Sequence, residues 1–202
     1  MYTQKHDVTA RLQRLLNDEK IRTAVLRASV DTSKREPWYA RQIKDGVQVV
    51  ICHPKHQTTN GVPRISRVLV ATDFSPQASN ALEWARSLAG AFGAKLVLLH
   101  VVDVSSLAKT GALMAGPNAL HLLREQAQRS MDELKARIPD ADTVIREGSP
   151  SPVIVDAAVE LQCQMIVMGT HGRSGLAHFV LGSVAEYVVR NSNVPVLTIR
   201  TH

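Results

Sequence analysis

The 202-residue sequence predicts an α/β protein built on an open parallel sheet with helices on both faces. Strand and helix patterns alternate along the last two-thirds of the chain, an order typical of successive βαβ units. The strands are uninterrupted apolar runs, such as RVLVAT at 67–72 and KLVLLHVV at 95–102, which indicates burial on both sides. We expect five strands in this sheet.

The first helix of this region follows strand 67–72 and has clear signals at both ends. Ser75 is suited to cap the helix, Pro76 to its first position, and Gly93 to its end. Apolar residues recur at helical spacing between these signals: Ala78, Ala81, Leu82, Ala85, Leu88, Ala89 and Phe92.

The remaining elements continue the alternation. A Ser/Gly/Ala-rich insertion at 105–118 follows strand 95–102. The predicted helices are 119–137, 151–161 and 183–190, and the predicted strands are 143–146, 165–169 and a last one from Val196 to Ile199.

We expect this last strand, VLTI, to close one side of the sheet and to pair with a second copy in a homodimer, because it is too apolar for a bare edge. The alternative is that residues 1–52 fold back and cover it.

Residues 1–64 differ from the rest in charge and form a separate extension, ahead of a domain at 65–202. They hold 12 Lys and Arg against 6 Asp and Glu, so the whole net charge of +6 lies there. A basic segment can bind nucleic acid through phosphate contacts, or it can be a solvated surface, and both readings stay open. Residues 53–64, with Asn60-Gly61 and Pro63, are expected to be a linker.

The extension has a pattern of its own. A helical pattern at 8–17 precedes an apolar stretch at 23–28, a second helical pattern at 33–44 and the β-branched run VQVVIC at 47–52. This order predicts a small βαβ unit with a leading helix. Because two strands cannot bury both faces of a sheet, we expect the unit to pack on another part of the chain.

Composition limits the class of protein. Apolar residues make up 45% and charged residues 21% of the chain, as in soluble globular proteins. No apolar run approaches the roughly 18 residues of a membrane span, and the first residues lack a signal-peptide core. The two cysteines, Cys52 and Cys163, form no CxxC pair. We therefore expect a cytoplasmic protein without a zinc site, a disulfide or a membrane segment.

A glycine-spaced segment at 168–184, MGTHGRSGLAHFVLGSV, carries the strongest indication of a ligand. Gly169 and Gly172 would let backbone N–H groups approach an anion, and Gly182-Ser183 opens a helix whose first N–H groups lack helical partners. A phosphate chain could lie between them, with Arg173 as a cation. The alternative is a glycine-rich turn that binds nothing.

The second candidate element is Ala71-Thr72-Asp73, at the carboxyl end of the first strand of the sheet. Open α/β sheets bind ligands at the point where their winding reverses. If the first and fourth strands are neighbours, Asp73 and Gly169 flank one crevice, and the Asp73 carboxylate could accept hydrogen bonds from a base or ribose. Alternatively, Asp73 only caps the following helix.

Together these residues resemble the universal stress protein family. Gly169-x-x-Gly172, nine residues and Gly182-Ser183 match the G-2x-G-9x-G-S/T motif of its ATP-binding members, and VATDFS, HVVD and VPVLTIR extend the match over 67–200. The resemblance implies strand order 3-2-1-4-5 and dimers paired at the last strand. It implies an ATP site, often with Mg²⁺ or Mn²⁺, formed by Ala71, Thr72, Asp73, Val101, Met168, Gly169, Gly172, Arg173, Gly182, Ser183 and Val184. Gln164 departs from the aspartate that many members have.

Residues 21–55 are similar to a short stretch of the C-terminal lobe of superfamily-two helicases, where an ICNP-like strand end corresponds to ICHP here. The sequence contains no Walker A, DExH or arginine-finger motif, which excludes helicase activity. 

We expect a regulatory nucleotide-binding protein of the stress response and not a dedicated enzyme. No catalytic residue is predicted: His171 lacks a partner for acid–base chemistry, Ser183 lies in no G-x-S-x-G elbow, and His100 reads as a core residue. ATP hydrolysis, if any, would be slow. Two alternatives stay open, a nucleic-acid-binding adaptor acting through residues 1–64 and a slow ATPase acting as a timer.

Overall fold

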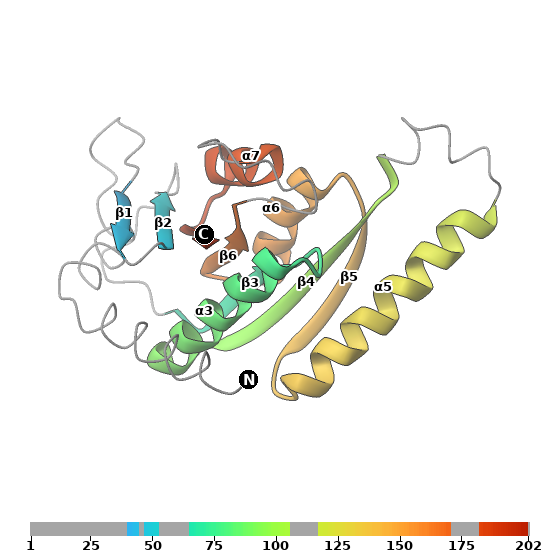
Figure 1. Cartoon of the computed structure of the whole chain (residues 1–202), viewed down its shortest axis with the longest axis horizontal. Helices are drawn as coiled ribbons and strands as arrows, with labels where there is room; N and C mark the ends of the chain where they lie inside the picture. The colour runs from blue at the N-terminus through green and yellow to red at the C-terminus, as the bar shows by residue number, and fades with distance from the viewer. Residues whose placement is uncertain (1–39, 45–46, 53–64, 106–116, 171–181, 202) are drawn as a thin grey trace.

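The computed structural model describes residues 40–44, 47–52, 65–105, 117–170 and 182–201. Within them, seven strands form one sheet in the order β1-β2-β7-β6-β3-β4-β5 (Figure 1). Two of these strands come from the first 64 residues, so the N-terminal extension and the α/β region share one sheet.

Five strands of the sheet are parallel, as predicted. They are β3 (Arg67–Ala71), β4 (Lys95–Asp103), β5 (Asp142–Gly148), β6 (Met165–Gly169) and β7 (Val196–Thr201). Pairing runs from β5 through β4, β3 and β6 to β7. Counted along the chain from β3, this is the order 3-2-1-4-5, which confirms the predicted fold.

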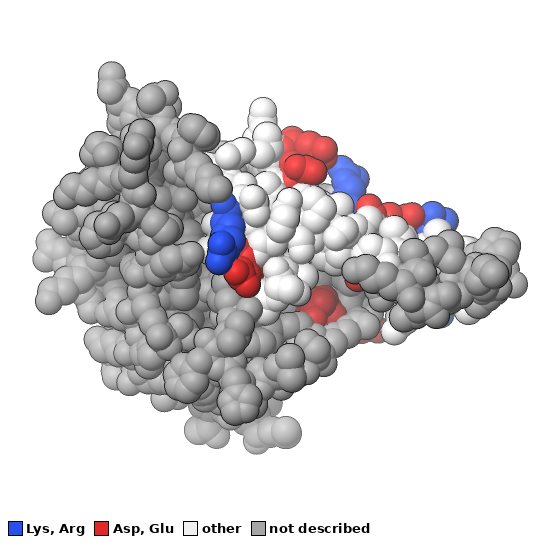
Figure 2. Space-filling view, turned by 90° about the horizontal axis from the view of Figure 1, so that it is seen from above, with Lys and Arg blue, Asp and Glu red and all other residues white. Residues whose placement is uncertain are grey.

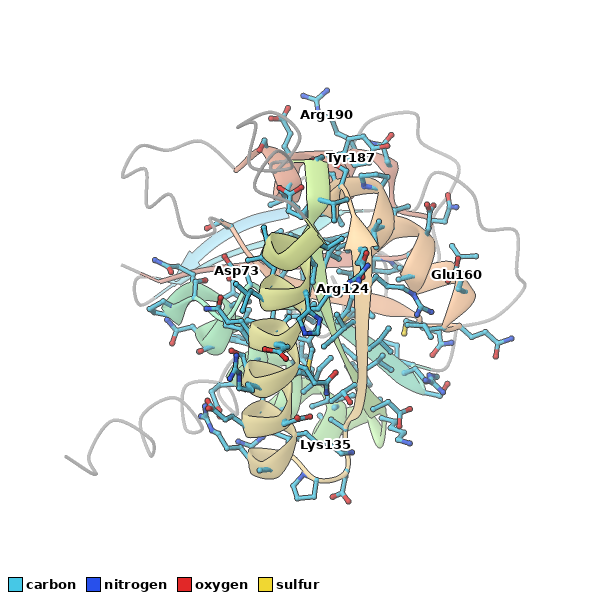
Figure 3. All side chains as sticks on the ribbon, turned by 90° about the vertical axis from the view of Figure 1, so that its right-hand side faces the viewer. Asp73, Arg124, Lys135, Glu160, Tyr187 and Arg190 are labelled. Carbon is cyan, nitrogen blue, oxygen red and sulfur yellow. The ribbon has the colours of Figure 1, made fainter. Side chains whose placement is uncertain are left out.

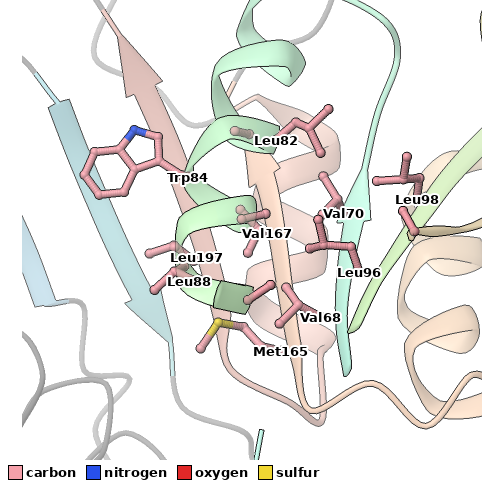
Figure 4. Close-up of a cluster of buried hydrophobic side chains, with 14 of the residues drawn as sticks. Val68, Val70, Leu82, Trp84, Leu88, Leu96, Leu98, Met165, Val167 and Leu197 are labelled. Atoms are coloured by element: carbon pink, nitrogen blue, oxygen red, sulfur yellow. The ribbon is translucent and has the colours of Figure 1, made fainter. Parts of the chain in front are cut away.

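Helices cover both faces of the parallel strands. The helices α3 (Pro76–Phe92) and α5 (Pro117–Arg137) lie on one face, and α6 (Pro150–Glu160) and α7 (Ser183–Asn191) lie on the other (Figure 1). The side chains of a strand point alternately to its two faces, so each buried strand contributes to two cores. Val68 and Val70 belong to the core under α3, shown in Figure 4, whereas Leu69 belongs to the core under α6 and α7.

The ends of α3 and α5 follow from their sequences. The Ser75 hydroxyl accepts a hydrogen bond from the N–H of Ala78 (3.2 Å), Pro76 is the first helical residue, and Gly93 ends α3 in the left-handed region with φ of 63°. These contacts confirm the predicted signals. At the last turn of α5, Lys135 donates to the carbonyl groups of Pro139 (2.7 Å) and Ala141, which fixes the turn into β5 (Figure 3).

Gln164 joins the starts of two neighbouring strands. Its side-chain oxygen accepts hydrogen bonds from the N–H and hydroxyl of Ser66 and from the N–H of Arg67, each at 2.9 Å. These contacts tie the start of β6 to the start of β3. They lie at the end of the sheet opposite to Asp73 and Gly169, so the departure from aspartate at this position does not touch the predicted site.

The N-terminal strands form an antiparallel hairpin, which corrects the predicted βαβ unit. β1 (Ala40–Lys44) pairs with β2 (Val47–Cys52), closing at the register pair Lys44 and Val47. The predicted strand 47–52 is confirmed, and the predicted helix over 33–44 is wrong at 40–44. Two residues, Asp45-Gly46, connect the strands, and Asp-Gly is a strong hairpin signal that outweighs a weak helical pattern. The predicted elements at 8–17 and 23–28 and the linker at 53–64 lie outside the described residues.

The sheet edge at β7 is occupied by the chain itself. β2 runs antiparallel to β7 and pairs with all six of its residues, from Val47 opposite Thr201 to Cys52 opposite Val196. The predicted homodimer through Val196 to Ile199 assumed a bare edge at this strand, and the structure contradicts that assumption. The alternative, that the N-terminal segment folds back over the edge, describes the observed arrangement.

Candidate functional site

The candidate site lies where the winding of the sheet reverses. β3 has β4 on one side and β6 on the other, with Ala71 opposite both Leu99 and Met168. From β3 the chain builds outward through β4 and β5, and it then crosses to β6 and β7 on the other side. α3 and α7 both begin at this end of the strands, on opposite faces. Ligand sites of open α/β proteins occupy this position.

A turn with fixed geometry follows β3. The Thr72 N–H still donates to the carbonyl oxygen of Leu99 on β4 (2.9 Å). The Thr72 hydroxyl accepts from the N–H of Phe74, and the Asp73 carboxylate accepts from the N–H of Ser75, both at 3.0 Å. Phe74 has a φ of 62°, a left-handed conformation that costs a non-glycine residue about 1–2 kcal/mol. The flanking side-chain acceptors hold this residue in place.

Asp73 was expected either to contact a nucleotide or to cap α3. Ser75 is the N-cap residue of α3. The carboxylate of Asp73 instead accepts a hydrogen bond from the N–H of Ser75, and so holds the backbone just before the helix. Figure 3 shows Asp73 beside the start of α3. A carboxylate has two oxygens and about four acceptor positions, so this contact and a ligand contact are compatible.

His100, on the neighbouring strand β4, supports the same turn. Its Nδ1 lies 2.8 Å from the carbonyl oxygen of Thr72, and because a carbonyl only accepts, Nδ1 carries the hydrogen. The imidazole ring also packs against the ring of Phe74, with centroids 4.4 Å apart. Sequence reasoning treated His100 as a core residue and missed this position. Its place near the carboxyl end of a strand adjacent to β3 was the available signal.

At the end of β6, Gly169 packs closely against the start of α3. A Cβ there would lie 3.3 Å from the carbonyl carbon of Gln77 and 3.4 Å from its Cβ, in the first turn of α3. The glycine therefore lets β6 approach the backbone of α3, whether or not a ligand binds. This close approach also brings the start of α3 beside the start of the glycine-spaced segment.

A hydrogen bond between Thr170 and Gly182 joins the two sides of that segment. The N–H of Thr170 donates to the carbonyl of Ile199 on β7 (3.0 Å), and the carbonyl of Thr170 accepts from the N–H of Gly182 (2.8 Å). The chain thus leaves the sheet at Thr170 and returns to the same point at Gly182. Predicted site residues Gly172 and Arg173 lie between them, outside the described residues.

The start of α7 differs from the start of α3. Gly182 is its N-cap residue, and in the described part of the chain no side chain caps it. By helix geometry the first N–H groups of α7 have no acceptor in the helix, and they carry a partial positive charge. Ser183 is exposed and Val184 is half-buried. This end of α7 can donate hydrogen bonds to an anion.

Nine predicted site residues are described, and all lie at this end of the fold. Ala71 and Met168 are only 8% and 6% exposed, so they would offer a ligand little beyond their backbone. Val101 is half-buried on β4, where it packs against the core under α6 and α7. The nine are Ala71, Thr72, Asp73, Val101, Met168, Gly169, Gly182, Ser183 and Val184.

Charged groups beyond the site are largely paired. Arg124 on α5 contacts both carboxylate oxygens of Glu147 on β5, at 2.5 and 2.8 Å, and this hydrogen bonding lowers the pKa of Glu147. On α7, Arg190 lies 2.8 Å from Glu186. On the face shown in Figure 2, most of the described basic side chains likewise lie next to acidic ones. This pairing agrees with the zero net charge of residues 65–202.

Metal-ligand clusters and the thiol of Cys163 are two further candidates for chemistry within the described residues. No group of three or more His, Cys, Asp and Glu side chains there could hold a metal ion. Cys163 is buried, and desolvation raises the pKa of its thiol, as expected for a small core side chain. None of the described helices is long and apolar enough to span a membrane.

The fold and the position of the candidate site define an open α/β protein whose switch point is the place where proteins of this class bind ligands. The sequence model of the universal stress protein family matches residues 64–200, and the chain belongs to that family. It is 32% identical over 145 residues to universal stress protein MJ0531 of Methanocaldococcus jannaschii, a match that covers 70% of this chain and 85% of that protein.

Solved structures show the same relationship. The structure of MJ0577, also a universal stress protein of Methanocaldococcus jannaschii, aligns with a TM-score of 0.62 and 30% identity, covering 69% of this chain and 99% of that one. UspA from Lactobacillus plantarum aligns with a TM-score of 0.59 and 27% identity, covering 68% and 99%. The family match begins at residue 64, so the hairpin of β1 and β2 lies outside it.

Proposed function

We propose that this chain binds an adenine nucleotide, ATP in the first place, at the carboxyl ends of β3 and β6, as a regulatory module of the stress response. The observation that carries the proposal is the start of α7, which no side chain of the described residues caps and which a hydrogen bond between Gly182 and Thr170 links to the end of β6. A helix start without a side-chain cap, beside a glycine-spaced segment at a switch point, suits phosphate oxygens.

Each part of the site has a role in this proposal. The first N–H groups of α7 and the hydroxyl of Ser183 donate to phosphate oxygens, together with Gly172 and Arg173 of the motif. Asp73 accepts from the base or the ribose, and Val101 provides an apolar wall. Mg²⁺ or Mn²⁺ bound with the nucleotide would neutralise phosphate charge.

We also propose how the chain is divided and where the protein acts. Residues 65–202 are the nucleotide-binding domain, 1–64 are an extension of it, and the protein works in the cytoplasm. We assign no described side chain as a general base for ATP hydrolysis, and we therefore propose no dedicated catalysis.

The experiment has two parts. Mass spectrometry of nucleotide released from the purified protein identifies the resident ligand. Calorimetry then compares ATP binding, expected in the micromolar range and so at about −8 kcal/mol, between the wild type and a Gly172→Val/Gly182→Val double variant. The matched control is Gly90→Ala on α3, where an added Cβ meets nothing within 4 Å. Unchanged ATP affinity in a folded double variant would show that the site is assigned wrongly.

A second candidate function rests on charge. The net charge of +6 lies within residues 1–64, which favours contacts with nucleic-acid phosphates. A gel shift that weakens with salt, and that persists in the double glycine variant, would support an adaptor function separate from nucleotide binding.

A further inference from the structure

We propose that the hairpin of β1 and β2 is a built-in cap, which keeps the chain monomeric by occupying the β7 edge against a second copy. This inference is independent of nucleotide binding. It rests on how β2 pairs with β7, on the composition of β7 and on the length of chain between β2 and β3.

The pairing is complete. β2 has six residues and β7 has six, and each residue of one is opposite a residue of the other. A strand at a sheet edge presents a row of unpaired N–H and C=O groups, which is a template for pairing with another chain. Here β2 is the strand that pairs with this edge, along the whole length of β7.

β7 is a strand that needs such protection. Its residues Val196, Leu197 and Ile199 are 0%, 5% and 1% exposed, and they belong to the two cores of the domain. Since both faces of β7 are buried under helices, its backbone edge is the part left open to another strand, and such an edge can pair with a second copy about a two-fold axis.

The connection favours pairing within one chain. Cys52, the last residue of β2, is opposite Val196, the first residue of β7. The chain therefore leaves β2 at the amino end of the parallel strands, the same end at which β3 begins. From β2 to β3 the chain must pass β7 and β6, about 14 Å at the usual strand spacing. Fourteen residues, 53–66, are available, and extended they would reach about 46 Å. The connection is therefore long enough for β2 to pair with β7 of its own chain.

A tether of this length also gives the hairpin a concentration advantage. Short flexible linkers hold a tethered partner at an effective concentration in the millimolar range, whereas a second copy at micromolar concentration is about a thousandfold more dilute. With the hairpin in place, the edge is therefore filled from within the chain. With the hairpin displaced, the β7 edge of one copy pairs with that of another.

The first test traps the pairing through Cys52. Directly opposite residues of an antiparallel pair have Cα atoms about 4.5–5.5 Å apart, which is within the range of a disulfide. In a Cys163→Ala background, Val196→Cys should form an intrachain disulfide with Cys52 on mild oxidation. Leu197→Cys is the matched control, because neighbouring residues of a strand face opposite sides. A disulfide between two chains in the Val196→Cys variant would overturn the proposal.

The second test measures mass by light scattering over a wide range of protein concentration. The full chain should remain a monomer of 22.1 kDa. Val49→Pro/Val50→Pro should give a dimer. Successive N–H groups of a strand point to opposite neighbouring strands, so one of the two prolines removes a hydrogen-bond donor from the side that faces β7. The control is Gln42→Pro/Ile43→Pro in β1, which does not pair with β7 and should stay monomeric. A dimeric wild type, or a β2 variant that stays monomeric, would refute the cap.

Discussion

The imidazole of His100 and the carbonyl group of Thr72 are joined by a hydrogen bond of 2.8 Å, which connects β4 to the turn that follows β3. The turn carries Asp73 and continues through Phe74, whose ring packs on the same imidazole. His100 thus holds the candidate site from the neighbouring strand, as a positioning residue that the proposed ligand need not touch.

Replacing His100 with leucine should loosen the turn after β3. We expect a loss of about 1 kcal/mol in the free energy of unfolding, the usual net value of one hydrogen bond, and weaker ATP binding because Asp73 is less well placed. Urea denaturation and calorimetry measure the two effects. His100→Asn, which keeps an N–H donor near the Nδ1 position, should restore much of both. If leucine and asparagine behave alike, the hydrogen bond to Thr72 is not what positions the turn.

Asp73 allows its structural and binding roles to be separated. Asp73→Asn keeps an oxygen that accepts from the N–H of Ser75, whereas Asp73→Ala removes it. Both variants should bind ATP less tightly by about 1.5–3 kcal/mol through loss of a charged acceptor, and only the alanine variant should also lose stability. Binding of inorganic triphosphate should change little in either. An equal loss for triphosphate would place Asp73 at the phosphates or the metal.

Two glycines should respond in opposite directions to alanine. Gly169→Ala places a Cβ at 3.3 Å from the Gln77 backbone, so we expect destabilisation by about 1–3 kcal/mol through overpacking. Gly90→Ala, in open space on α3, should stabilise the protein by about 0.5–1 kcal/mol, because glycine is a poor residue in a helix. Denaturant unfolding measures both. A Gly169→Ala protein as stable as the wild type would mean that β6 and α3 can separate at no cost.

Most of the α/β domain was predictable from sequence because its signals are local and agree with one another. Ser75-Pro76 and Gly93 mark the ends of α3, and the apolar run from Met165 to Gly169 coincides with β6. The strand order came from family resemblance, since periodicity alone does not say which strands are neighbours.

The N-terminal hairpin was not predicted because two signals conflicted. The pattern at 33–44 suits a helix locally, while Asp45-Gly46 ahead of VQVVIC suits a hairpin, and pairing with β7 decides between them. The role of His100 was missed for a related reason. It depends on contact with Thr72, 28 residues away, and no spacing rule within one strand indicates it.

Ion pairs at the amino ends of the parallel strands make the stability of the fold depend on pH. Asp142, at the start of β5, lies 2.6 Å from the Nζ of Lys95 and 3.1 Å from the guanidinium of Arg67. Hydrogen bonding to Lys95, with the charges of Lys95 and Arg67, lowers the pKa of Asp142 below its usual value of 3.8. A carboxyl group whose pKa is lowered by folding stabilises the protein above its usual pKa, and this stability is lost as the pH falls through the folded-state value.

Asp142→Asn should therefore be less stable than the wild type at neutral pH, and the difference should shrink as the pH falls below about 4. Since the Asp142 side chain is 36% exposed, solvent screening limits the effect to less than about 1 kcal/mol. Urea unfolding at several pH values measures it, with Asp140→Asn, an exposed carboxylate in the turn before β5, as the control for removing one charge. A difference between wild type and Asp142→Asn that stays constant down to acid pH would assign the effect to hydrogen-bond geometry instead of charge. Because these residues lie at the amino ends of β3, β4 and β5, ATP binding at the opposite end of the sheet should be unchanged by the substitution.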